Sequence, residues 1–169
     1  MENTVKLYSL DYSYSRTYLA AGLFVAGNVA LPYLFHLIPQ GGVTWLPIYF
    51  FTLIGAYKYG WKVGLLTAVA SPLVSFLLSG MPVLAALPAI LLKSVLLALA
   101  AGFTAGRWQR VSIPLLLLVV VGYQVAGTLG EWVLKGNLYA ALQDFRLGVP
   151  GMLLQVFGGY GSIRYFIRK

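Results

Sequence analysis

Charged residues are missing from long stretches of this chain, and their absence constrains the fold more than any other feature. Of its 169 residues, 9% are charged and 60% are hydrophobic, and the mean hydropathy is +0.82. A soluble domain of this length exposes much of its surface to water and cannot bury so large an apolar fraction. The sequence therefore predicts an integral membrane protein.

Six apolar segments approach the length of about 20 residues that a helix needs to cross the hydrocarbon core. Backbone groups in lipid must be hydrogen-bonded internally, and the alternating pattern of a β-barrel is missing. The predicted fold class is an all-α membrane protein, a single domain over residues 1–169 in which six transmembrane helices form one bundle. The spans are predicted at residues 17–37, 42–57, 60–78, 83–105, 113–134 and 149–167. The second contains Pro47, which predicts an irregular outer end.

Basic residues concentrate in alternate connections between these spans. Nine precede span one, join spans two and three, join spans four and five, or follow span six, whereas two lie in the third outer loop. These are Lys6, Arg16, Lys58, Lys62, Arg107, Arg110, Arg164, Arg168 and Lys169, against Lys135 and Arg146. Because short basic loops stay in the cytoplasm, both termini are predicted to be cytoplasmic.

Composition also excludes several classes of function. A pI near 9.8 would suggest nucleic-acid binding in a soluble protein, but here the basic loops match topology and anionic lipid headgroups, so nucleic acid is not expected as a partner. The chain has no cysteine, which rules out disulfides and thiolate chemistry. Its single histidine, His36, has no acidic residue within a helical turn, and no phosphate-binding loop is present. We therefore expect no enzyme, no catalytic residue, no metal and no cofactor.

Ionisable residues inside predicted spans are costly and are candidates for function. Lys93 lies in the middle of span four, and Gln124, Thr128 and Glu131 share one face of span five, while Gln155 lies in span six. Lys93 and Glu131 can form a structural ion pair. Alternatively, Lys93 supplies a positive charge for an anionic ligand, with the two glutamines adding hydrogen bonds. The sequence leaves both interpretations open.

The first outer loop, from His36 to Trp45, is uncharged and contains two glycines, which suits a lid over a cavity. Trp45 and Tyr49 are candidates for stacking on a flat ligand, although aromatic residues near a membrane boundary equally serve as interface anchors. Ser75 belongs to a polar stripe on the outer half of span three. These residues predict a ligand pocket in the outward half.

Small residues recur every fourth position in span one, at Gly22, Ala26 and Ala30. Such a stripe lets another helix approach closely. Packing inside the bundle and docking of an external membrane partner both remain open explanations.

Taken together, the chain resembles the substrate-binding S components of energy-coupling factor transporters, the vitamin uptake systems of prokaryotes. The likeness covers nearly the whole length. Its most specific parts are Leu-Pro-Ile-Tyr at 46–49, Gly-Ala-Tyr-Lys-Tyr-Gly at 55–60 and the run Ser-Pro-Leu to Gly-Met-Pro at 71–82.

The resemblance implies a substrate-capture subunit in the prokaryotic cytoplasmic (inner) membrane. Its partners would be a small vitamin-like ligand, the lipid bilayer, a transmembrane coupling subunit and two cytoplasmic ATPases. Gly22, Ala26 and Ala30 would form the surface for the coupling subunit. Many relatives with the Gly-Met-Pro turn carry an acidic residue near the position of Lys93, so a lysine there implies a carboxylate-bearing vitamin or precursor.

Two alternatives come from other classes. A membrane scaffold similar to the small rod-shape-determining membrane proteins would have a similar length and about six spans, but needs no buried lysine, cavity or lid. A self-sufficient ion-coupled carrier would usually show inverted repeats and midplane carboxylates, and neither is evident.

Overall fold

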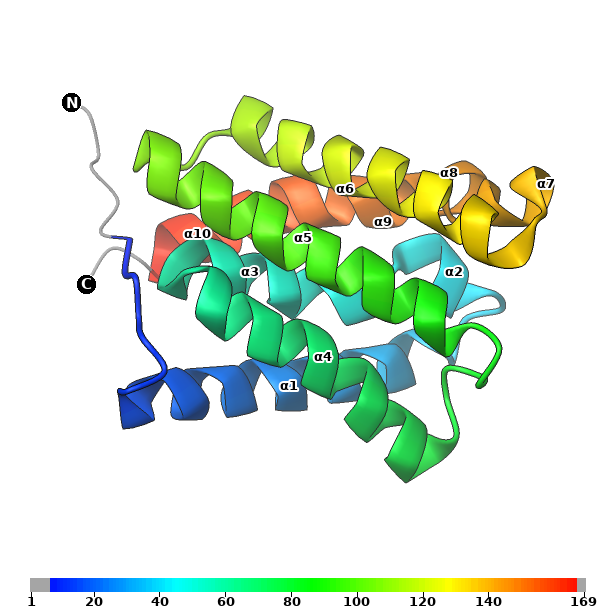
Figure 1. The fold of residues 1–169 in the computed structure, drawn as a ribbon, viewed down its shortest axis with the longest axis horizontal. Coiled ribbons are helices and arrows are strands. Elements are labelled where there is room, and N and C mark those ends of the chain that lie inside the picture. Colours follow the sequence, from blue (N-terminus) through cyan, green and yellow to red (C-terminus); the bar gives the residue numbers. More distant parts are fainter. Residues whose placement is uncertain (1–6, 167–169) are drawn as a thin grey trace.

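A computed structural model describes residues 7–166, and over this range the protein is all-α (Figure 1). Four of its helices are long and apolar enough to cross a membrane, so the chain is a multi-pass membrane protein with four candidate spans. They are α1 (Ser15–Phe35), α4 (Trp61–Ser79), α5 (Leu87–Trp108) and α6 (Ile113–Lys135). Each corresponds to one of the six predicted spans, with ends that differ by up to four residues.

Local sequence explains where several of these helices begin and end. The Ser112 side chain accepts a hydrogen bond from the backbone N–H of Leu115, which caps the start of α6. Gly80 and Gly136 follow the last residues of α4 and α6 with φ of 68° and 66°. A left-handed glycine is the usual end of a helix because it has no Cβ to clash. The fourth predicted span starts later than expected, since residues 83–86 form a turn before α5.

The second predicted span is not one continuous helix. Its outer half consists of α2 (Gly41–Trp45) and a 3-10 turn η1 (Pro47–Tyr49), and only then does α3 (Phe50–Tyr59) begin. Leu46 separates α2 from η1 with φ of 47°, and Pro47 follows it. The irregular outer end predicted from Pro47 is present.

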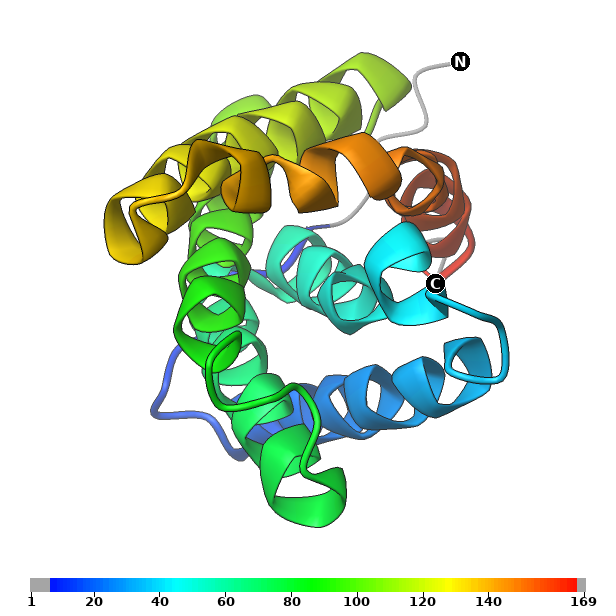
Figure 2. The same cartoon turned by 90° about the vertical axis from the view of Figure 1, so that its right-hand side faces the viewer.

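Helix α3 lies in the middle of the bundle, and the longer helices surround it (Figure 2). It packs against α1, α4, α5 and α10, and its residues from Thr52 to Lys58 are all buried. Because protein rather than lipid covers this helix, it needs neither the length nor the apolar exterior of a spanning segment.

The sixth predicted span is a continuous helical run that changes its winding. It comprises α9 (Val149–Leu153), a π-helical segment η2 (Leu154–Gly158) and α10 (Gly159–Phe166). The connection from α6 contains two further short helices, α7 (Leu138–Ala141) and α8 (Gln143–Leu147), which the sequence did not predict. A π-helical segment inserts one extra residue per turn and often marks a functional position.

Different connecting segments form the two ends of the bundle (Figure 1). One end contains residues 7–16, 58–62, 107–113 and 159–166, and we call it the basic end because these segments are rich in Lys and Arg. The opposite end contains residues 36–49, 79–87 and 134–150, and we call it the cavity end because these segments line a cavity. Between them, the exposed surface of the long helices is apolar, as a lipid-facing surface must be. Examples are Leu23, Leu77, Phe103, Leu118 and Val125.

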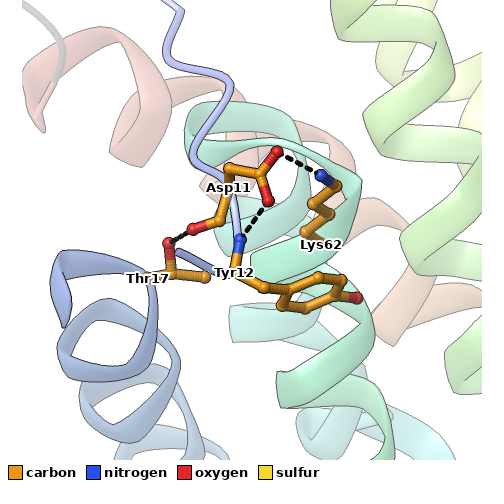
Figure 3. A network of polar contacts seen from close by, with 4 residues as sticks. All are labelled: Asp11, Tyr12, Thr17 and Lys62. Atoms are coloured by element: carbon orange, nitrogen blue, oxygen red, sulfur yellow. Dashed lines mark hydrogen bonds and ion pairs between the residues drawn. The ribbon is translucent and has the colours of Figure 1, made fainter. Parts of the chain in front are cut away.

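At the basic end, the segment before α1 is tied to the bundle by polar contacts (Figure 3). The Asp11 carboxylate pairs with Lys62 at 2.6 Å and accepts a hydrogen bond from the backbone N–H of Tyr12, while the Thr17 hydroxyl donates to the Asp11 carbonyl. The Lys62 ammonium lowers the pKa of the Asp11 carboxyl below its ordinary value. These contacts fix the N-terminal segment against α1 and α4.

Candidate functional site

A cavity of about 520 Å³ lies at the cavity end of the bundle. Its volume falls within the range of small-molecule sites, which is roughly 300–1,000 Å³. The wall comes from the end of α1, the loop and helix α2 that follow, η1, α4, the segment before α5 and its first turn, the end of α6, α7 and the start of α8. Most of the wall is apolar, and its polar side chains are His36, Gln40, Tyr49, Ser75, Glu131, Lys135 and Gln143.

Four of the predicted site residues therefore meet at one cavity: His36, Tyr49, Ser75 and Glu131. His36 ends α1 and is exposed, and the loop after it forms one side of the cavity. Ser75 and Tyr49 are buried on the opposite elements, α4 and η1. The loop that the sequence predicts as a lid contributes residues to the wall of this cavity.

Three ionisable groups form a chain that leads from the cavity wall into the protein. The Glu131 carboxylate lies between two ammonium groups, with Lys135 Nζ 2.5 Å from Oε1 and Lys93 Nζ 2.5 Å from Oε2. The Lys135 side chain is 35% exposed, Glu131 is 6% exposed and Lys93 is fully buried. Among these three described side chains, two ammonium groups face one carboxylate, an excess of one formal positive charge.

Lys93 fits into the bundle because the facing helix has no side chain at the point of contact. A Cβ on Gly127 would lie 2.5 Å from Cγ of Lys93. Real Cβ atoms essentially never approach so closely, so glycine at this position of α6 creates the space for the alkyl chain of the lysine. Gly127 and Glu131 are four residues apart and thus share one face of α6.

Lys93 does not contribute to the cavity wall. The wall residues of α5 include Ala89 and Ile90, and Lys93 lies one helical turn farther inside. The structure therefore favours the ion-pair interpretation of Lys93, and the cation on the wall is Lys135. The sequence interpretation missed Lys135 because it was counted as a loop charge, although its i,i+4 spacing from Glu131 was a visible signal.

A cluster of buried polar groups lies on α6 and η2. The Tyr123 hydroxyl donates to Oε1 of Gln155 at 2.9 Å, and the Tyr123 ring lies 5.7 Å from that of Tyr49 on the cavity wall. Within the described residues, both amide atoms of Gln124, the Thr128 hydroxyl and the amide nitrogen of Gln155 have no hydrogen-bond partner. Buried polar groups are rarely left unpartnered, and water or a ligand group commonly satisfies them.

Gln124, Thr128 and Gln155 are all buried, and none of them lines the cavity. Gln155 lies in the π-helical segment, which is a second indication that the local geometry serves a site.

Trp45 has a structural place in the fold. Its ring packs 5.6 Å from that of Phe35 at the end of α1, and its backbone meets α9, where a Cβ on Gly151 would lie 2.4 Å from the Trp45 carbonyl oxygen. These contacts hold α2 against α1 and α9. Trp45 does not line the cavity, so stacking on a ligand there would require α2 to move.

The small residues of span one face outward. Gly22, Ala26 and Ala30 are exposed on α1, and a Cβ on Gly22 would meet nothing within 4 Å. Packing among the described residues therefore does not explain the stripe, which faces lipid or an external partner.

One structural polar group was not singled out from the sequence. Asn28 is fully buried and donates hydrogen bonds to the hydroxyls of Thr52 and Ser71, while its carbonyl oxygen accepts from the backbone N–H of Phe51. It links α1, α3 and α4. The available signal was an asparagine alone among the apolar residues of span one.

Within residues 7–166, no group of three or more His, Asp or Glu side chains is placed to hold a metal ion. The chain matches no protein-family model, no curated protein and no solved structure.

Proposed function

We propose that this protein is the substrate-capture S component of an energy-coupling factor importer. In this proposal it crosses the prokaryotic cytoplasmic membrane six times, with both termini in the cytoplasm and the cavity facing outward. It binds a small vitamin or vitamin precursor and delivers it inward through a transmembrane coupling subunit and two ATPases. The concentration of basic residues at the basic end supports this orientation.

The observation that carries the proposal is the cavity with the Glu131–Lys135 pair on its wall. A cavity of ligand size, mostly apolar with a few converging polar groups, is what small-molecule recognition requires. The single formal positive charge favours a ligand with one carboxylate. Lys135 is the group that would meet this carboxylate, and Lys93 keeps the Glu131 carboxylate paired from the inside.

The exposed stripe of Gly22, Ala26 and Ala30 supports docking of a coupling subunit. Small residues let the backbones of two helices approach closely in lipid, where packing rather than the hydrophobic effect drives association. No ATP-binding sequence is present in the chain, so the energy in this proposal comes from the partner subunits.

The test is to identify, by native mass spectrometry, the small molecule that copurifies in mild detergent, and then to measure its affinity. Lys135→Ala should weaken binding by about 10-fold or more, because hydrogen bonds to charged groups are worth roughly 1.5–3 kcal/mol. The matched control is Arg146→Ala, a basic residue at the same end that is outside the cavity wall. Absence of any bound molecule, or equal losses in both variants, would contradict the proposal.

The two other functions predict different outcomes. A membrane scaffold would copurify with no small molecule, and its cavity would have no role. An ion-coupled carrier would take up the ligand alone in liposomes, whereas a capture subunit needs its partners for uptake. The cavity favours ligand binding over a scaffold.

A further inference from the structure

A second cavity, of about 350 Å³, lies at the basic end of the molecule. It is bounded by the segment before α1, the first two turns of α1 and the last turn of α3. The wall contains two cationic and two phenolic side chains, Arg16, Lys58, Tyr8 and Tyr59, with Leu10 and Leu19 as apolar neighbours. Among residues 7–166, the side chains that line this cavity include two cations and no carboxylate, so its chemistry favours an anion.

The cavity is held open by regular contacts rather than by a loose loop. The backbone N–H groups of Tyr8 and Leu10 donate to the carbonyls of Lys58 and Tyr59, at 2.9 and 3.0 Å. The rings of Tyr8 and Tyr59 stack at 5.9 Å, and Lys58 Nζ lies 5.2 Å from the centre of the Tyr59 ring. Lys58 is 7% exposed, so the surrounding protein holds its side chain in place.

Aromatic residues place this cavity at the depth of the lipid headgroups. Trp61 and Trp108 lie at the same end of the bundle and are 42% and 41% exposed, and Tyr18 on α1 is 54% exposed. Exposed tryptophan and tyrosine collect at the boundary between membrane and water. An anion bound between Arg16 and Lys58 would therefore sit in the headgroup layer.

An apolar surface leads from the cavity toward the membrane interior. Leu19 forms part of the wall, and Leu23 continues on α1 one turn farther, 72% exposed. Gly22 and Ala26, the small residues of the stripe, lie beside them on α1 and are exposed. A ligand with an anionic head and a hydrocarbon tail matches both parts, whereas a free anion would use the cavity alone.

We propose that this cavity binds the phosphate headgroup of an anionic phospholipid, with one acyl chain lying along α1 over Leu19 and Leu23. Basic pockets between transmembrane helices are a recurrent form of anionic-lipid site. The lipid would occupy the inner end of the small-residue stripe. It would therefore be displaced, or shared, when another helix packs on this face of α1.

The experiment uses the purified full chain, delipidated in detergent, with phosphatidylglycerol or zwitterionic phosphatidylcholine added and bound lipid counted by native mass spectrometry. Wild type should bind phosphatidylglycerol more tightly than phosphatidylcholine. The double variant Arg16→Gln/Lys58→Gln should weaken phosphatidylglycerol binding by about 30-fold, since each basic residue near an anionic surface contributes a factor of about five. Arg107→Gln, an exposed basic residue at the same end but outside the cavity, should leave binding unchanged.

Two further arms keep the proposal falsifiable if the double variant folds poorly. Arg16→Gln alone changes an exposed side chain and should still weaken phosphatidylglycerol binding about five-fold. Inorganic phosphate at millimolar concentration should not displace the lipid, because it lacks the acyl chain. Equal binding of the two lipids by wild type, equal losses in the Arg16 and Arg107 variants, or displacement by phosphate would overturn the assignment.

Discussion

At the scale of single residues, the most consequential group is the Glu131 carboxylate, because it neutralises a lysine that has no access to water. Lys93 is fully buried and its ammonium lies 2.5 Å from Glu131. A buried ion pair adds little net stability, but removal of one partner leaves an uncompensated charge. Glu131 therefore has two roles, since it also lies on the cavity wall.

Replacement of this carboxylate should lower the stability of the whole bundle. We expect Glu131→Gln to lower the free energy of unfolding by about 3–5 kcal/mol, the usual result of breaking a buried pair. Thermal unfolding in detergent measures the change. The double variant Lys93→Met/Glu131→Gln removes the orphaned charge and should recover most of the loss. A single variant as stable as wild type would show that Lys93 does not depend on Glu131.

The position of Lys93 also depends on a glycine, and this dependence can be tested with a matched pair of substitutions in α6. Gly127→Ala places a Cβ 2.5 Å from Cγ of Lys93, so the bundle should lose about 1–3 kcal/mol of stability by overpacking. Gly122→Ala meets nothing within 4 Å and should be neutral or stabilising by up to about 1 kcal/mol. Equal changes in the two thermal midpoints would contradict this account.

The sequence predicted the partners of this site better than their roles. Lys93 and Glu131 stood out because an ionisable residue inside a span needs a counter-charge. This requirement links the two residues although they are 38 positions apart in the sequence. Which lysine lies on the cavity wall depends on how deep each side chain lies along its helix. Lys135 lies on the wall, whereas Lys93 does not.

At the scale of elements, the four long helices followed from apolar length and Pro47 predicted the break in the second span, whereas the other irregular elements were not predicted. The π-helical segment around Gln155 and the short helices α7 and α8 depend on packing between distant segments. The close contact of Gly151 with the Trp45 backbone is an example, since it joins α9 to α2 across 106 positions. The residue pattern of a single segment does not predict such a contact.

The segment before α1 is held by backbone hydrogen bonds and by the Asp11–Lys62 ion pair, and the part of its attachment that the ion pair supplies should depend on pH. Lys62 lowers the pKa of the Asp11 carboxyl in the folded protein below the ordinary value of 3.8. A lowered folded pKa means that the pair stabilises the attachment above the ordinary pKa and loses this effect as the pH falls through the folded pKa. We therefore expect hydrogen exchange of residues 8–14, corrected for its intrinsic pH dependence, to accelerate below about pH 3.8.

The control for this prediction is the neutral variant Asp11→Asn, in which exchange of the same residues should be faster already at pH 6 and should show no acid transition. Lys62→Gln should give the same result, and the two substitutions combined should add nothing further, because they remove one interaction. An acid transition that persists in Asp11→Asn would assign it to another group. The effect should be small in magnitude, since Asp11 is exposed and solvent screens the pair.

At the scale of the whole molecule, the orientation proposed for the bundle can be tested directly, because the chain contains no cysteine. We expect a single cysteine at Gln109, an exposed residue at the basic end, to react with a membrane-impermeant maleimide only in opened cells. A cysteine at Tyr139, which is 71% exposed at the cavity end, should react in intact cells. Labelling of both positions from the same side would contradict the proposed six-span topology.

The exposed face of α1 is the property of the whole molecule that links capture to transport. In the proposed function, ligand binding uses the cavity end, while delivery requires a second membrane protein to pack on Gly22, Ala26 and Ala30.

Because the two surfaces are separate, a bulky residue on the stripe should affect ligand binding and delivery differently. Ala26→Trp should keep the wild-type ligand affinity but abolish uptake in cells that contain the coupling subunit and ATPases, since an indole prevents close approach of a helix. Val125→Trp, at a lipid-facing position of α6 that is 46% exposed, adds the same bulk elsewhere and should leave uptake intact. Normal uptake with Ala26→Trp would contradict a role of the stripe in transport. A loss of ligand affinity in the same variant would show that the stripe and the cavity are not independent.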